Sequence, residues 1–165
     1  MKIPFTLIVL FLTYLTTAQT IELPNTIISI NSDYYASVSD ENHPQIIKKL
    51  EAEILNYNFK VLKDEFDNPK DIYQVTFKLK QGKIEAFFNS KGKIVKTIEQ
   101  YYDVRLPMDV MSAISNQYPN WAIVEDLCLI KYHCDTDIVK KEYQIKIKNL
   151  DQVLTLKANQ NGTFI

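Results

Sequence analysis

The fold is decided by residues 73–95, which read YQVTFKLKQGKIEAFFNSKGKIV. Apolar and polar residues alternate here, so Tyr73, Val75 and Phe77 point to one face and the polar residues between them to the other. A second strand continues the apolar face through Ile84, Ala86 and Phe88. A period of two with one apolar face is typical of antiparallel strands that are covered on one side only.

The same pattern returns at residues 143–165, which read YQIKIKNLDQVLTLKANQNGTFI. Aligned without a gap, the two stretches share identical residues at five positions, and their apolar positions stay in phase. The shared pairs are Tyr73 and Tyr143, Gln74 and Gln144, Lys78 and Lys148, Asn89 and Asn159, and Gly92 and Gly162. This self-similarity predicts an internal duplication.

Each copy ends in a hairpin turn of the same type. Asn89 and Gly92 in the first copy, and Asn159 and Gly162 in the second, occupy the first and fourth turn positions. Asparagine and glycine there favour a type I turn whose last residue is left-handed. A phosphate-binding loop is the alternative, but one glycine per turn with no following helix favours a structural role.

A helical stretch precedes each pair of hairpin strands. Residues 44–57 and 107–118 both begin with proline and both carry an apolar stripe with helical spacing. The predicted fold is α+β, with two tandem helix-then-antiparallel-strands units sharing one sheet and helices on one face. We expect the units to span residues 44–104 and 105–165, after an N-terminal edge strand and linker over residues 19–43.

The first eighteen residues resemble a secretory leader. Lys2 precedes an apolar run over residues 3–15, and small residues follow at 16–18. The apolar run is short for a membrane span, which needs about 20 residues. The pattern predicts a periplasmic or secreted protein with no membrane span after cleavage, and an uncleaved N-terminal anchor is the alternative.

Charge and motifs restrict the function. The net charge of −1 argues against a nucleic-acid partner, because phosphates require a basic surface. Cys128 and Cys134, if they share one strand, are too far apart for a disulfide, which favours two free thiols. His133 and Cys134 would point to opposite faces of a strand, so we expect no metal site, and no motif indicates a cofactor.

The outward sheet face is the candidate binding surface. It includes Lys78, Phe87 and Lys146. Tyr132 is a further candidate, from residues 120–133, where both the odd-numbered and the even-numbered positions carry apolar residues. In a regular strand, one face would carry Ile123, Leu127 and Leu129, and the other would carry Val124, Cys128, Ile130 and Tyr132. Such a strand is either sandwiched in the sheet or part of an exposed patch that binds a partner.

A family resemblance rests on residues 106–121 and on the turn at 89–93. The residues that carry it are Leu106, Pro107, Val110, Ala113, Ile114, Tyr118, Pro119 and Trp121. In this the chain resembles the PepSY-like domains of small bacterial envelope proteins, whose fold is shared with the β-lactamase inhibitor protein. The resemblance implies a non-enzymatic binding or inhibitory module with a protein or peptide partner in the cell envelope. A small envelope enzyme, such as a nucleotidyltransferase or hydrolase, and a purely structural envelope protein are the alternatives, and the oligomeric state stays open.

Overall fold

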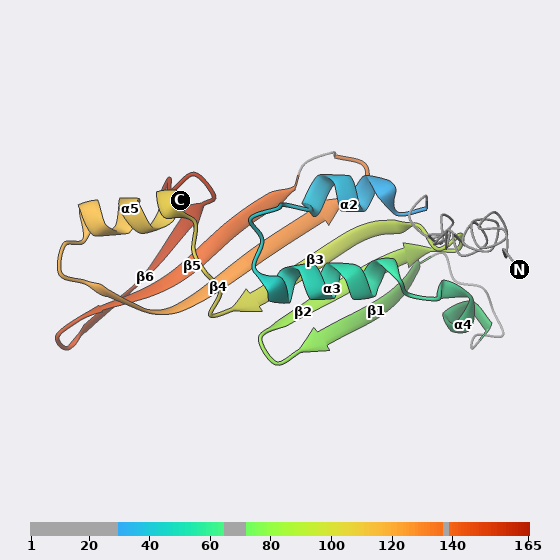
Figure 1. Ribbon diagram of the computed structural model, residues 1–165, viewed down its shortest axis with the longest axis horizontal. Helices are drawn as coiled ribbons and strands as arrows, with labels where there is room; N and C mark the ends of the chain where they lie inside the picture. Colours follow the sequence, from blue (N-terminus) through green and yellow to red (C-terminus); the bar gives the residue numbers. More distant parts are fainter. Residues whose placement is uncertain (1–29, 65–71, 137–138) are drawn as a thin grey trace, which may run out of the picture.

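The protein is an α+β structure built on one six-stranded antiparallel sheet (Figure 1). The computed structural model describes residues 30–64, 72–136 and 139–165. Each strand pairs with the next one along the chain, so the sheet order is β1-β2-β3-β4-β5-β6. The strands are β1 (Ile72–Leu79), β2 (Gly82–Asn89), β3 (Ile94–Tyr102), β4 (Ala122–His133), β5 (Lys140–Asn149) and β6 (Gln152–Asn159).

Two of the helices lie where the sequence predicts them. They are α3 (Gln45–Leu55) and α5 (Met108–Gln117), each directly after a proline. The structure adds α2 (Ser32–Val38), inside the segment that the sequence assigns to a linker, and α4 (Phe59–Asp64). The predicted leader at 1–18 and residues 19–29 of the predicted edge strand and linker lie outside the described residues, and Ile30 is in a turn.

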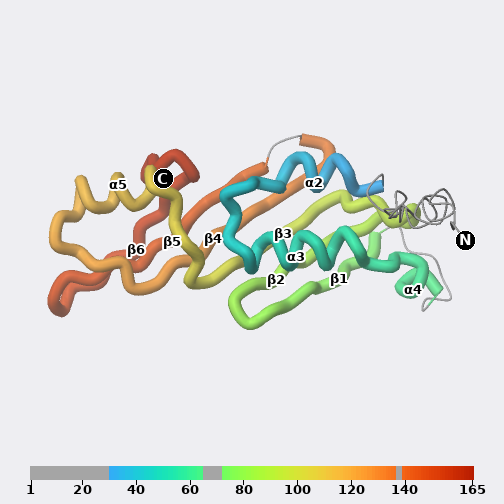
Figure 2. The backbone as a smooth tube through the Cα atoms, viewed as in Figure 1, coloured from blue at the N-terminus to red at the C-terminus, as the bar shows by residue number. Residues whose placement is uncertain are grey.

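The core lies between one face of the sheet and the helices. Figure 2 shows α3 lying along β1 and β2 and α2 near the middle of the sheet, by β3 and β4, while α5 lies beside the other end of the sheet near the C-terminus. Leu50 of α3 and Val110 of α5 are fully buried, as are the strand residues that face them. These strand residues include Ile84, Ala86 and Phe88 of β2, Cys128 and Ile130 of β4, and Tyr143, Ile145 and Ile147 of β5.

The two turns have the same hydrogen-bond pattern. The Asn89 side-chain oxygen accepts from the backbone N–H groups of residues 91 and 93, and that of Asn159 accepts from residues 161 and 163. Gly92 has φ 82° and Gly162 has φ 76°. Glycine adopts this left-handed backbone without the steric cost that a β-carbon adds, so both turns depend on it.

A β-bulge near the start of β4 changes which residues share a face. Ile123 pairs with Ile147, whereas Glu125 pairs with Lys146, so one extra residue lies between two consecutive positions of β5. Ile123 therefore lies on the helix-side face, and its expected grouping with Leu127 and Leu129 is wrong. Strict alternation predicts that grouping, and a bulge breaks alternation.

Candidate functional site

The sheet face opposite the helices is rich in lysine, and no described helix covers it (Figure 1). Among the described strand residues on it, lysines outnumber glutamates by eight to three, although the whole chain has a net charge of −1. We call this surface the lysine face. Its charged residues are Lys78, Lys83, Lys96, Lys131, Lys140, Lys146, Lys148 and Lys157, with Glu85, Glu125 and Glu142.

Three of the four predicted binding residues lie on the lysine face. Lys78 is exposed on β1, and Phe87 is half-buried on β2 with the Lys96 ammonium 5.1 Å from its ring centre. Lys146 on β5 donates to the Glu125 carboxylate at 2.6 Å. This pair borders a shallow hollow of about 350 Å³ that is also lined by Tyr102 and Leu127.

The centre of the lysine face is apolar. Ile98, Leu127 and Leu129 are half-buried there, on β3 and β4. The two interpretations of residues 120–133 therefore each describe part of β4. The strand is central, and its Cys128 and Ile130 side chains are buried on the helix side. The alternate residues Leu127 and Leu129 point to the opposite side and belong to the lysine face.

Tyr132, the fourth predicted binding residue, does not belong to this surface. It lies on the helix side of the sheet, is only 3 % exposed, and packs edge-on against Tyr34 of α2 at 5.3 Å between ring centres. The sequence interpretation is wrong at this position because α2, which covers Tyr132, was not predicted.

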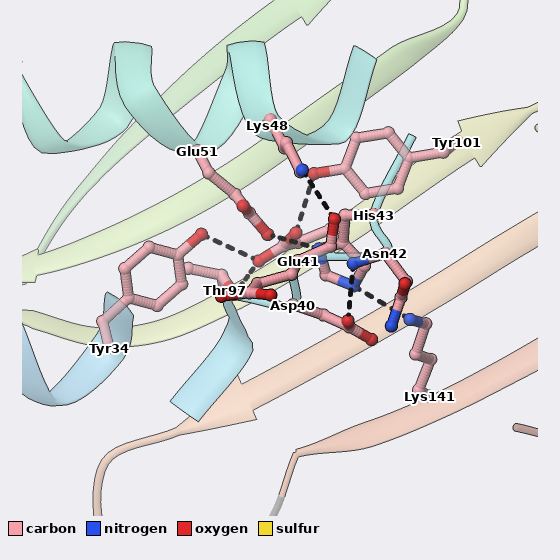
Figure 3. A network of polar contacts seen from close by, with 11 residues as sticks. Tyr34, Asp40, Glu41, Asn42, His43, Lys48, Glu51, Thr97, Tyr101 and Lys141 are labelled. Carbon is pink, nitrogen blue, oxygen red and sulfur yellow. Dashed lines mark hydrogen bonds and ion pairs between the residues drawn. The ribbon is translucent and has the colours of Figure 1, made fainter. Parts of the chain in front are cut away.

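A network of buried polar side chains lies under the helices (Figure 3). The Glu99 carboxylate on β3 has no exposed surface and accepts hydrogen bonds from the hydroxyl groups of Tyr34, Thr97 and Tyr101. Burial raises the pKa of Glu99, and the three hydroxyl donors oppose that rise. Burial beside this carboxyl also raises the pKa of Tyr101. The three donors hold the Glu99 side chain in one orientation.

The same region holds a hydrogen-bonded chain of three charged or titratable side chains, of which Glu51 and His43 are buried and Lys141 is half-buried. Glu51 of α3 and His43 are 3 % and 6 % exposed, and the His43 Nδ1 lies 3.1 Å from the Glu51 carboxylate. The Lys141 ammonium lies 2.9 Å from the His43 Nε2, across 98 positions of sequence (Figure 3). Because an ammonium has no acceptor, Nε2 accepts and Nδ1 carries the hydrogen that Glu51 receives. His43 is thus a neutral link between a carboxylate and an ammonium.

The sequence interpretation did not find this chain. The position of His43 directly before Pro44 at a helix start favours helix capping or solvent exposure, whereas the structure buries its side chain. Two signals were present, because Glu51 adjoins the apolar stripe of α3 and Glu99 has the inward parity of β3. Charged residues at inward positions indicate a buried polar network.

The expectation of no metal site assumed that His133 and Cys134 both lie in a regular strand, and the structure differs at this point. β4 ends at His133, and the following turn brings the ligand atoms of His133, Cys134 and Asp135 within 4.8 Å of one another. The argument that His133 and Cys134 point to opposite faces is therefore wrong. The backbone N–H of Asp135 donates to the His133 Nδ1, so this ring nitrogen already has a hydrogen-bond partner within the turn.

Both cysteines are free thiols. Cys128 is buried next to Tyr143, and burial raises the pKa of its thiol to about 11. A thiol with this pKa is protonated at neutral pH and is a poor nucleophile.

No protein-family model matches the chain, and no curated protein matches it. None of the helices in the described ranges has the length and apolar character that crossing a membrane requires.

Proposed function

We propose that the protein is a non-enzymatic binding module whose lysine face binds an acidic protein or peptide segment outside the cytoplasm. The observation that carries this proposal is the separation of charge, with lysines concentrated on one open sheet face of a chain whose net charge is −1. Complementary charge steers such a partner and selects against basic ones. The apolar centre of the face supplies the desolvated contacts from which affinity derives.

The location and the family belong to the same proposal. The leader pattern at residues 1–18 supports export, and an intact mass that still includes these residues in exported protein would contradict cleavage. The matched turns at Asn89 and Asn159, together with helices α3 and α5 ahead of three strands each, support a tandem pair of PepSY-like units.

A defined acidic peptide tests the binding surface. We expect a short fluorescent peptide of alternating glutamate and leucine to bind, and the same peptide with glutamine in place of glutamate to bind at least about tenfold more weakly. Binding should weaken as salt is added, because exposed charges are screened. Fluorescence anisotropy measures both effects. Equal affinity for the two peptides would contradict the proposal, and so would binding only to anionic lipid vesicles.

Matched charge reversals locate the surface. Lys131→Glu, in the middle of the lysine face, should weaken binding of the acidic peptide about tenfold. Lys49→Glu makes the same charge change at an exposed position of α3 on the other side of the sheet and should leave affinity nearly unchanged. Equal losses in the two variants would indicate a general charge effect and would exclude the lysine face as the site.

Phe87→Ala separates binding from stability. The ring is half-buried and contacts Lys96 on an uncovered face, so we expect a loss of stability below about 1 kcal/mol. As an aromatic anchor, it should weaken peptide binding by about 1 to 3 kcal/mol. Chemical denaturation and anisotropy on the same preparation measure the two quantities. A variant that unfolds readily but binds normally when folded would show that Phe87 is a core residue.

A further inference from the structure

A second cavity lies on the helix side of the molecule. It has a volume of about 570 Å³, within the range of small-molecule sites. Its walls come from the connection between α2 and α3, the segment at 104–108 that leads into α5, strand β5, and the turn after β6. Segments far apart in the sequence thus meet around one half-open cavity.

Two cationic side chains border this cavity. Lys141 is fixed by the bond to His43, which is itself held by the buried Glu51 carboxylate. An ammonium has three donors and His43 uses one, so two remain for a ligand. The Arg105 side chain is exposed and has no ion-pair partner in the described parts of the chain.

The acidic group in the wall does not cancel this charge. Asp40 accepts a hydrogen bond from the backbone N–H of Asn42 at 2.8 Å. That hydrogen bond, with nearby His43 and Lys141, lowers the pKa of Asp40, so its carboxylate is ionised at neutral pH. With one carboxylate and two cationic side chains, the lining of the cavity has a net positive charge. The first turns of α3 and α5 also border it and add partial positive charge.

The rest of the wall is suited to an organic ligand. Ile47, Leu106, Met108 and Tyr143 supply apolar surface, and the amide side chains of Asn42, Gln160 and Asn161 supply hydrogen-bond donors and acceptors. A bare inorganic ion would leave the apolar wall unused, whereas a neutral apolar molecule would leave the cations without a partner. A ligand that combines one anionic group with a compact apolar body satisfies both.

We propose that this cavity binds a small organic carboxylate, whose anionic group lies between Lys141 and Arg105 and whose apolar part packs against the wall formed by Ile47, Leu106 and Met108. The lysine face is on the other side of the sheet, so this site is independent of the binding function proposed above. The Glu51–His43–Lys141 chain then has a functional role, because it fixes the ammonium at the edge of the cavity.

Benzoate and benzamide test the proposal, since they differ in charge but hardly in shape. We expect benzoate to bind the full chain with a Kd at least about tenfold below that of benzamide, because a charge-assisted bond is about twice as strong as a neutral one. Two-dimensional NMR titration gives both Kd values and shows which residues shift. Equal affinities, shifts confined to residues outside the cavity, or no saturable binding of benzoate would each overturn the proposal.

Three variants assign the anionic contact. Arg105→Gln changes an exposed side chain and should weaken benzoate binding severalfold without altering the fold. Lys141→Met should weaken it about tenfold or more. Lys148→Met, an equivalent substitution at an exposed position of the same strand on the other side of the sheet, should leave benzoate affinity unchanged. Unchanged benzoate affinity in both Arg105→Gln and Lys141→Met would overturn the site, whereas both of these variants should bind the acidic peptide as the unaltered protein does.

Discussion

Replacing His43 with leucine is expected to lower the free energy of unfolding by about 3 kcal/mol or more, because it leaves a buried carboxylate without its hydrogen-bond donor. Glu51 is 3 % exposed and would remain as a buried carboxylate without its hydrogen-bond donor. Lys141 would lose its acceptor at the same time. Urea denaturation monitored by circular dichroism gives this difference from the shift in midpoint at constant slope.

The controls separate the loss of a partner from the loss of a histidine. His133→Leu removes the other histidine, which is exposed, and should change stability by no more than about 0.5 kcal/mol. The double variant His43→Leu with Glu51→Leu removes the isolated carboxylate and should recover much of the loss, since replacing both partners of a buried hydrogen bond by apolar groups of similar shape can be nearly neutral. Equal effects of His43→Leu and His133→Leu would show that the hydrogen-bonded chain does not stabilise the fold.

Gly162→Ala is expected to destabilise the protein by about 3 kcal/mol, which combines the cost of a β-carbon in left-handed backbone with that of overpacking. A β-carbon at residue 162 would lie 2.5 Å from the backbone oxygen of Asp109, so either the turn or helix α5 must move. At Gly92 the nearest atom is 2.9 Å away and belongs to the Phe59 side chain, not to backbone. Gly92→Ala should therefore lose only about 1 to 2 kcal/mol.

This order is the reverse of the one that sequence position suggests. Gly162 lies three residues from Ile165, and a chain end that frays would make the substitution there the milder of the two. The turn after β6 instead packs against α5, where Ala113 is also in contact range. Thermal unfolding of the two alanine variants decides between the explanations, and a larger loss for Gly92→Ala would contradict the packing argument.

Local patterns predict much of the fold and part of the binding surface. Alternation places Lys78, Phe87 and Lys146 on one face because side-chain direction in a regular strand depends only on parity. It fails at Ile123, where a bulge resets the parity, and it does not assign Tyr132, whose strand is apolar on both faces. The alternation of residues along such a strand does not indicate which of its faces a helix covers.

The sequence by itself determined the two asparagine–glycine turns, the strands around them, and the helices α3 and α5, because these features depend on residues a few positions apart. Only the tertiary structure decided that α2 covers Tyr132, that Glu51, His43 and Lys141 form one hydrogen-bonded chain, and that Arg105 shares a cavity with Lys141. The physical reason is that burial and pairing are set by contacts between segments distant in sequence. His43 and Lys141 are 98 positions apart, and no local pattern records their contact.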